Sequence, residues 1–226
     1  MIKFLSGNEI NSYPKLQRTM YTDRAIQFSK RLRWEVTVDE NGEERDEYDA
    51  LNPFYVILED FNGAHAGSLR FLPTTGKTMV NDHFTHLTDG IKIQSPHIWE
   101  CTRFCVSPNS DRRAAAKLLA AGAFLMHECC IDHFVGVFDD RMERIYKTIG
   151  ANPTVLGRQQ VEKGTIGIGL WEFNDEQFQQ LLTRARLTRQ ELDWSFHASS
   201  FPFALLSTPV YNTPGSPSQC DLSFAY

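Results

Sequence analysis

The first third of the chain shows a helical period followed by an acidic stretch. Residues 15–34 are predicted to form a helix, because Arg24, Phe28 and Leu32 recur every four positions and so share one stripe. Residues 38–52 hold seven acidic side chains and one arginine. Such a run is typical of a solvated acidic loop.

The rest of the chain alternates between strand-like and helix-like runs. Aromatic and β-branched runs predict strands at residues 54–59, 66–72, 98–106, 133–138 and 165–173. Helical patterns are expected at residues 112–130, 140–149 and 175–193. Asn62-Gly63 supplies a hairpin turn, and residues 73–97 are expected to be a loop. This order predicts an α/β fold, with a mixed sheet flanked by helices.

Length and composition fit one globular domain with a tail. The chain has 226 residues, of which 42% are hydrophobic, enough for a sizeable core. We expect the main domain at residues 1–175 and an amphipathic helix at 176–196. Residues 197–226 are rich in Ser and Pro and predict a loosely ordered tail.

Charge and cysteine usage narrow the class of protein. The net charge of -5 disfavours general nucleic-acid binding. We find no apolar stretch long enough for a signal peptide or a membrane span. The five cysteines are odd in number and form no CxxC pair, which favours reduced thiols and a cytoplasmic location.

Two of the cysteines lie close to histidines. A zinc site that uses Cys129 or Cys130 with His127 or His133 is an alternative. Thiols packed as small apolar groups on a buried helix are the favoured interpretation. We therefore expect neither a metal nor a cofactor.

Four charged residues occupy positions at which the pattern calls for apolar side chains: Arg24, Arg70, Glu100 and Arg103. Buried charges are costly unless they are paired, so these residues should have partners. Asp46 and Asp49 in the acidic stretch are candidate counter-ions. The alternative is that each charge points to solvent on a half-exposed face.

Five blocks in order carry a resemblance to a known family. They are Arg24, Phe28 and Trp34; Glu44, Asp46 and Asp49; Gly67-Ser68-Leu69-Arg70; Phe84; and Trp99-Glu100 with Thr102-Arg103-Phe104. Over about residues 1–175 the chain resembles the acyl-homoserine-lactone (autoinducer) synthases. The resemblance implies an N-acetyltransferase-like three-layer α/β/α sandwich with a mixed, mostly antiparallel sheet. It also implies an acyltransferase that synthesises a quorum-sensing signal.

The resemblance implies a pocket for S-adenosylmethionine, here a co-substrate, formed by Arg24, Phe28, Trp34, Asp46, Asp49, Arg70 and Phe84. The aromatic rings can face the sulfonium cation and the adenine. The aspartates can balance positive charge, and the arginines can either bind a carboxylate or hold the aspartates in place. For Trp34 the alternative is a plain core anchor at the end of a helix.

The same resemblance implies the catalytic residues. Glu100 matches the general base that would deprotonate the substrate amine before it attacks a thioester. We expect Thr102 to hydrogen-bond near the acyl carbonyl and Arg103 to join the charge network. Strict strand alternation places Glu100 and Thr102 on one face and Arg103 on the other. If all three serve one site, a β-bulge must lie between residues 100 and 103.

The acyl donor is expected to be an acyl carrier protein. Acetyltransferases hold the coenzyme A pyrophosphate with a glycine-rich turn before the central helix, whereas here residues 107–124 carry alanines at those positions. Carrier proteins are acidic, so a basic docking patch is expected, and Arg141, Arg144 and Lys147, followed by Arg158, are candidates. The alternative is an ordinary solvated helix face.

The acyl group is less determined by the sequence. Family members that prefer 3-oxo chains often have a threonine where Phe138 and Asp139 stand, so a chain without a 3-oxo group is favoured.

Two rival functions are an acetyltransferase that uses coenzyme A and a non-catalytic binding domain. The missing glycine turn disfavours the first of these, and Glu100 with Arg103 disfavours the second.

Overall fold

The computed structural model describes residues 1–162 and 164–199, and a seven-stranded sheet forms its centre. The strands lie in the order β1-β2-β3-β4-β5-β7-β6. They are β1 (Ile2–Ser6), β2 (Phe54–Glu59), β3 (His65–Pro73), β4 (Ile98–Val106), β5 (His133–Asp139), β6 (Thr154–Val161) and β7 (Gly164–Glu172). Only β4 and β5 pair in parallel. The sheet is therefore mixed and mostly antiparallel, as expected.

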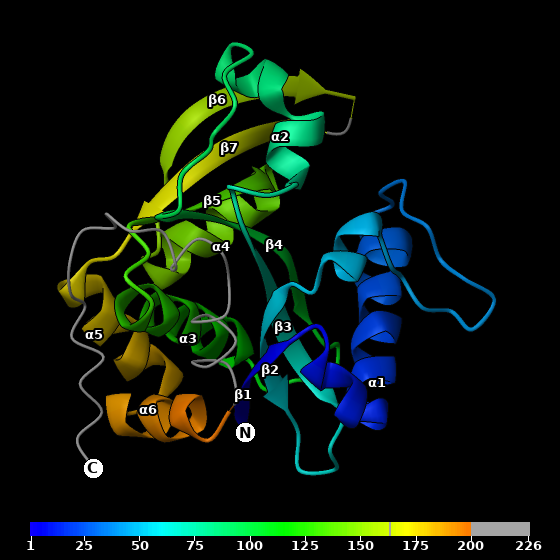
Figure 1. The fold of residues 1–226 in the computed structure, drawn as a ribbon, viewed down its shortest axis with the longest axis vertical. Helices are drawn as coiled ribbons and strands as arrows, with labels where there is room; N and C mark the ends of the chain where they lie inside the picture. Colours follow the sequence, from blue (N-terminus) through cyan, green and yellow to red (C-terminus); the bar gives the residue numbers. More distant parts are fainter. Residues whose placement is uncertain (163, 200–226) are drawn as a thin grey trace.

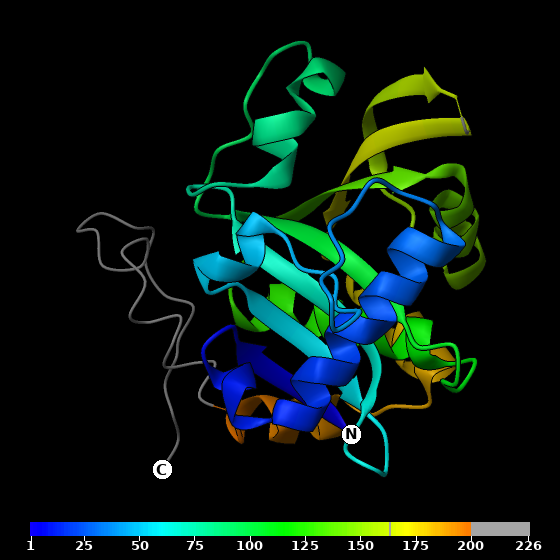
Figure 2. The same cartoon turned by 90° about the vertical axis from the view of Figure 1, so that its right-hand side faces the viewer.

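Helices cover both faces of the sheet, which confirms the three-layer α/β/α architecture (Figures 1 and 2). On one face α3 (Ala114–Glu128), α5 (Asp175–Ala185) and α6 (Arg189–His197) bury the largest apolar cluster. On the other face α1 (Pro14–Arg24) and α2 (Met79–His83) pack in two smaller clusters. The helix α4 (Asp140–Ile149) packs against β5 and β7 through Tyr146.

Shorter helical turns complete the fold. They are η1 (Glu9–Ser12), the π-helix η2 (Ala25–Arg31), η3 (Glu47–Leu51) and η4 (Thr85–Thr88). The predicted helix over 15–34 is thus α1 continued by a π-helical segment. The predicted loop over 73–97 holds α2 and η4. The acidic stretch at 38–52 holds η3, whose start is fixed by a capping box between Asp46 and Asp49.

The single helix expected over 176–196 is two helices. Arg186 adopts a left-handed conformation (φ 54°) that ends α5. Thr188 and Glu191 then form a capping box that starts α6. Both helices bury apolar residues in the same cluster as α3, namely Phe178, Leu181, Leu182, Ala185, Leu192 and Phe196. The expected tail at 197–226 lies outside the described residues from position 200 onwards.

The parallel pair β4 and β5 diverges after a short contact. Register partners run only from Ile98 with His133 to Glu100 with Val135. Beyond them Gly136 approaches β4 closely, because a Cβ at this position would lie 2.7 Å from the Cys101 carbonyl oxygen. The remaining residues of the two strands are not paired with each other, which leaves an opening between the strands at the centre of the sheet.

Among the described residues, no helix combines the length and apolarity needed to cross a membrane. Cys101 and Cys105 carry free thiols, as expected, whereas Cys130 is disulfide-bonded, which departs from the expectation of reduced thiols. No group of three or more His, Cys, Asp or Glu side chains in the described part of the chain is arranged to hold a metal.

Candidate active site

A bulge in β4 places neighbouring side chains on one face of the sheet. Ser68 pairs with Cys105 and Arg70 with Thr102, so β4 holds one more residue than β3 between these pairs. Arg103 takes up the extra length with a left-handed backbone (φ 52°). Thr102 and Arg103 consequently both reach the charged residues on the α1 side of the sheet. A bulge is thus present as expected, but it lies at residues 103–104, after the regular pairing of residues 100–102 and not between residues 100 and 103.

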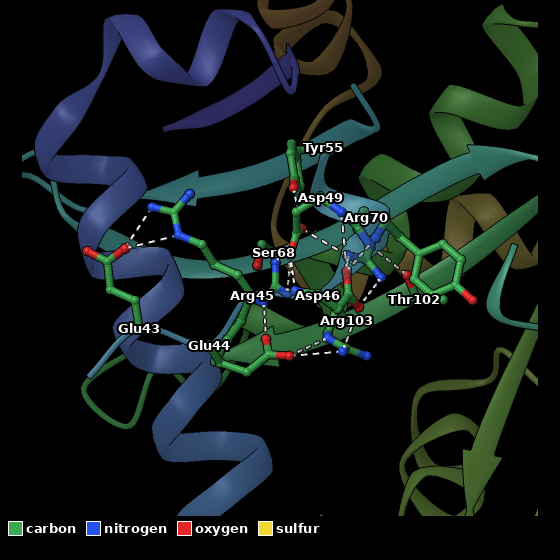
Figure 3. A network of polar contacts seen from close by, with 12 residues as sticks. Glu43, Glu44, Arg45, Asp46, Asp49, Tyr55, Ser68, Arg70, Thr102 and Arg103 are labelled. Atoms are coloured by element: carbon green, nitrogen blue, oxygen red, sulfur yellow. Dashed lines mark hydrogen bonds and ion pairs between the residues drawn. The ribbon is translucent and has the colours of Figure 1, made fainter. Parts of the chain in front are cut away.

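Two buried arginines, Arg24 and Arg70, the half-buried Arg103 and three carboxylates form one connected network (Figure 3). Arg24 is fully buried at the end of α1. Its Nε donates to Glu44 at 2.6 Å, and its two terminal nitrogens donate to Asp49 at 2.8 Å. The whole guanidinium is therefore occupied by protein carboxylates, so Arg24 holds the acidic residues in place rather than offering itself to a ligand.

Arg70 and Arg103 connect the remaining members. Arg70 Nη2 donates to Asp46 at 2.8 Å, Nη1 to Asp49 at 2.9 Å, and Nε to the Thr102 hydroxyl at 3.0 Å. Arg103 Nη2 lies 2.9 Å from Glu44 and 2.6 Å from Asp46. Both Asp46 and Asp49 are thus counter-ions of buried arginines, as the sequence predicts.

The network balances its own charge. Burial would raise the pKa of Asp49, but Arg24 and Arg70 more than offset this and hold that pKa well below its usual range. The phenol of Tyr55 also donates to Asp49 at 2.7 Å. The arginines and carboxylates therefore compensate one another's charge in a largely buried site.

Glu44 is the member that sequence reasoning missed as a site residue. It is fully buried and bridges Arg24 and Arg103 through its two carboxylate oxygens. In the sequence it is one of seven acids in a stretch that suggests solvent exposure. Its only signal is its place in the same block as Asp46 and Asp49.

Glu100 stands apart from the network. Its side chain is fully buried, and its two carboxylate oxygens accept the backbone N–H groups of Met79 (3.0 Å) and Val80 (2.6 Å) at the start of α2. Burial raises the pKa of Glu100 to about 7, even though both N–H groups favour its ionised form. It is therefore a carboxylate that can exchange a proton near neutral pH.

A cleft of about 730 Å³ lies between η2, η3, α2 and the divergence of β4 and β5. Six of the expected site residues line it: Phe28, Trp34, Asp46, Phe84, Thr102 and Arg103. Arg24, Asp49, Arg70 and Glu100 are not among its walls and lie behind them. The structure thus brings together an inner set of charges and an outer set of contact residues.

Two stacked aromatic rings form one wall of this cleft. Trp34 lies over Phe28 with ring centroids 5.2 Å apart, and Arg103 lies 5.3 Å from the Phe28 ring. Phe28 belongs to the π-helical segment, a rare conformation that is frequent at functional sites. Trp34 is 41% exposed, so it is a wall of the cleft and not a core anchor.

A smaller apolar cavity of about 80 Å³ lies on the opposite side of the sheet, between β3, β4, β5, α3 and α5. Leu69, Phe71, Leu119, Met126 and Phe134 are among its walls. Cys101, Phe104, Val137 and Tyr146 line both the cleft and the cavity. The two spaces therefore meet where β4 and β5 diverge.

The expected docking residues lie on α4. Arg141, Arg144 and Lys147 are exposed. Lys147 and Arg158 both pair with Glu143, at 3.0 Å and 2.9 Å. Arg141 and Arg144 form no ion pair with any residue that the structure describes. The structure thus places two uncompensated cations on α4, which also contributes Met142 and Tyr146 to the cleft.

Comparison with known proteins agrees with this geometry. The autoinducer synthase family matches residues 8–181. An acyl-homoserine-lactone synthase of Rhizobium etli is 37% identical over 196 residues, which cover 84% of this chain and 91% of the relative. The synthase LasI has a crystal structure that superposes with a TM-score of 0.70 at 25% identity, over 81% of this chain and 94% of LasI.

A second solved structure shares the fold at lower identity. It is that of BjaI, a CoA-dependent acyl-homoserine lactone synthase with SAM and isopentyl-CoA, and it superposes with a TM-score of 0.75 at 22% identity. The superposition covers 83% of this chain and 90% of BjaI. With its family match, its relatives and the arrangement of its cleft, the chain belongs to the acyl-homoserine-lactone synthases, which are acyltransferases.

Proposed function

We propose that this enzyme transfers an acyl chain from acyl carrier protein to the amino group of S-adenosylmethionine, then closes the lactone and releases methylthioadenosine. The observation that carries this proposal is the meeting of a polar, aromatic-walled cleft with an apolar cavity at the opening between β4 and β5. The cleft suits a cationic amino acid with an adenine ring. The cavity suits an alkyl chain.

The walls of the cleft match the acceptor. The exposed face of Trp34 and the ring of Phe84 can contact the adenine or the sulfonium cation. Arg103 uses Nε and Nη2 within the protein, which leaves Nη1 for the carboxylate of the acceptor. Arg24 and Arg70, whose donors are occupied, keep Asp46 and Asp49 at fixed positions behind this wall.

Thr102 and Glu100 would act at the reacting atoms. The Thr102 oxygen accepts a hydrogen bond from Arg70, so its own O–H remains free to donate to the acyl carbonyl as negative charge develops there. Glu100 would take the proton of the acceptor amine through a water, because its carboxylate lies behind Met79 and not at the wall of the cleft. A pKa near 7 suits this exchange.

Lactone closure needs less from the protein. The carboxylate of the acylated acceptor attacks its own γ-carbon, the bond from that carbon to sulfur breaks, and the electron pair leaves with neutral methylthioadenosine. The positive sulfonium already activates this leaving group. The cleft therefore mainly has to hold the chain in a folded conformation.

The turn before α3 supports a carrier protein as the donor. Asp111 accepts the backbone N–H of Arg113 just before α3 and also contacts the ammonium of Lys117 at 3.1 Å. Its negative charge stands where a pyrophosphate would need donors. On the other side of the opening, the free cations Arg141 and Arg144 suit an acidic protein surface.

Purified enzyme provides the test. S-adenosylmethionine is supplied with matched acyl chains on acyl carrier protein and on coenzyme A, and products are identified by mass spectrometry. We expect acyl-homoserine lactone and methylthioadenosine in equal amounts, with the carrier-protein donor preferred. Absence of lactone with every donor and chain length would refute the synthase function. A preference for coenzyme A would refute the donor assignment alone.

A further inference from the structure

Tyr146 holds a hydroxyl at the junction of the cleft and the apolar cavity. It projects from α4 and lines both spaces. Its ring packs against Trp171 (centroids 5.0 Å apart) and Phe138 (6.1 Å), and the residue is 8% exposed. Within the part of the chain that the structure describes, no hydrogen bond engages the hydroxyl.

The other polar groups of the cavity are either satisfied or outside it. Trp171 Nε1 donates to the Ala151 carbonyl at 2.8 Å. Glu172, Asn174 and Gln177 are exposed at its outer rim. Apart from the weakly polar thiol of Cys101, the buried lining is apolar. The Tyr146 hydroxyl is therefore surrounded mainly by apolar side chains in the lining of this cavity.

Tyr146 is a buried residue that borders both spaces, and its hydroxyl bonds to no residue that the structure describes, so the hydroxyl is available to a bound molecule. Burial also raises the pKa of Tyr146 far above its usual value, so the group keeps its proton and can donate. A hydroxyl that gains its partner only from a bound molecule meets both observations.

The geometry points to an acyl donor that carries an oxo or hydroxyl substituent close to its carbonyl, with the Tyr146 hydroxyl hydrogen-bonded to that oxygen. This inference rests on the proposed function. Thr102 faces the cleft, where the carbonyl would react, whereas its neighbour Cys101 packs in the core on the opposite face beside Tyr146. The acyl chain would thus pass through the sheet from the cleft to the cavity. The Tyr146 hydroxyl would contact it there, beyond the carbonyl.

This inference replaces the expectation of a chain without a 3-oxo group. That expectation rests on the end of β5, where Phe138 stands instead of a threonine. The structure supplies a hydroxyl from α4 instead, eight positions further along the chain. Oxo and hydroxyl substituents both present an oxygen to a donor, and the experiment separates them.

The test compares Tyr146→Phe with the wild-type enzyme on matched donors of one chain length: unsubstituted, 3-oxo and 3-hydroxy. We expect the wild type to prefer one of the substituted donors and the variant to lose that preference by about 10-fold in kcat/KM. The unsubstituted donor should be used equally well by both enzymes. Tyr13→Phe, which removes a hydroxyl from the surface, should change neither value.

Stability gives a second readout. Because the hydroxyl has no partner among the residues that the structure describes, Tyr146→Phe should unfold at the same or a higher temperature than the wild type. A lower unfolding temperature would show a structural role and overturn the inference. An equal loss with all three donors would place the hydroxyl on the thioester carbonyl and also overturn it. If both enzymes make lactone and Tyr146→Phe keeps the donor preference of the wild type, this inference alone is refuted. If the wild type makes no lactone from any donor, the proposed function is refuted.

Discussion

Glu100 differs from the other charged residues of the site because its partners are backbone amides. These amides belong to Met79 and Val80 at the start of α2, so the carboxylate that we propose as the base also fixes a wall of the cleft. Thr78, at the position that normally caps a helix, is left with an unpartnered buried hydroxyl. The proposed general base and the α2 wall are therefore one unit.

The raised pKa of Glu100 predicts the pH dependence of turnover. Only the ionised form can accept a proton, so kcat should rise with pH up to an apparent pKa of about 7 and then level off. Glu100→Gln should keep the fold, lower kcat by about 100-fold or more, and lose this inflection. Steady-state rates between pH 5.5 and 8.5, roughly the range that brackets this pKa, provide the measurement. Near-normal turnover in the variant would remove Glu100 from the base role.

Glu44 should be among the most sensitive residues for stability. Glu44→Gln leaves three arginines, two of them fully buried, against two carboxylates, and we expect a loss of about 3 kcal/mol in the free energy of unfolding. The adjacent Glu43→Gln is the matched control, because Glu43 pairs with the half-exposed Arg45 and should cost at most about 1 kcal/mol. Urea unfolding of both variants measures the difference. Equal losses would mean that the network does not stabilise the fold as a unit.

At the scale of elements, the β6 strand and η4 are held together at one close approach. A Cβ on Gly157 would lie 1.9 Å from the Leu87 carbonyl oxygen. The contact matters for the cleft because the residue before η4 is Phe84, one of its walls. Only a residue without a side chain fits at this position of β6.

Gly157→Ala should therefore push η4 away from β6. We expect a loss of about 1 to 3 kcal/mol in stability and a higher KM for S-adenosylmethionine, because Phe84 moves with η4. Gly76→Ala is the control, since a Cβ there would make only an ordinary 3.7 Å contact with the Pro73 carbonyl oxygen. Chemical denaturation and initial rates check both effects. An unaltered KM in a destabilised Gly157→Ala protein would separate η4 from the acceptor site.

The elements that the sequence predicts well are those with a clear period. The strand at 98–106 and the helix at 140–149 have the predicted bounds, and the helix is bounded by an Asp139 N-cap and by Gly150 in a left-handed conformation. The strands β1 and β6 were missed. β1 is buried on both faces and pairs with β2, about 50 positions away along the chain, and β6 is mostly exposed. Neither has an amphipathic pattern.

The site shows a similar division. Inward charges and the need for a bulge follow from the spacing in 98–106, since a strand cannot turn Glu100, Thr102 and Arg103 to one face otherwise. The Glu44 bridge and the Tyr146 hydroxyl depend on which residues meet across the fold, and one sequence does not contain that information. The break between α5 and α6 was visible in the Thr188-x-x-Glu191 capping box, which the helical period obscured.

At the scale of the whole molecule, the free cations of α4 predict how the donor is recruited. The double variant Arg141→Glu, Arg144→Glu should raise the KM for acyl carrier protein about 10-fold or more, with little change in the KM for S-adenosylmethionine. High salt should also raise the KM of the wild-type enzyme for acyl carrier protein, because salt screens the charges on α4. Arg18→Glu on α1, also an exposed arginine, is the control for net charge. Similar effects of both changes would mean that overall charge, not this helix, attracts the donor.

The three-against-three charge network limits how this enzyme can change over evolutionary time. Neutralising one of its six members leaves one charge of the opposite sign in excess, at a cost of about 3 to 5 kcal/mol where the network is fully buried, as at Arg24, Arg70 and Glu44. That is a large share of the roughly 5 to 15 kcal/mol that keeps a typical protein folded. Viable replacements must therefore come in compensating pairs, so the six residues are inherited as a block, while residues that line the cavity for the alkyl chain can diverge one at a time.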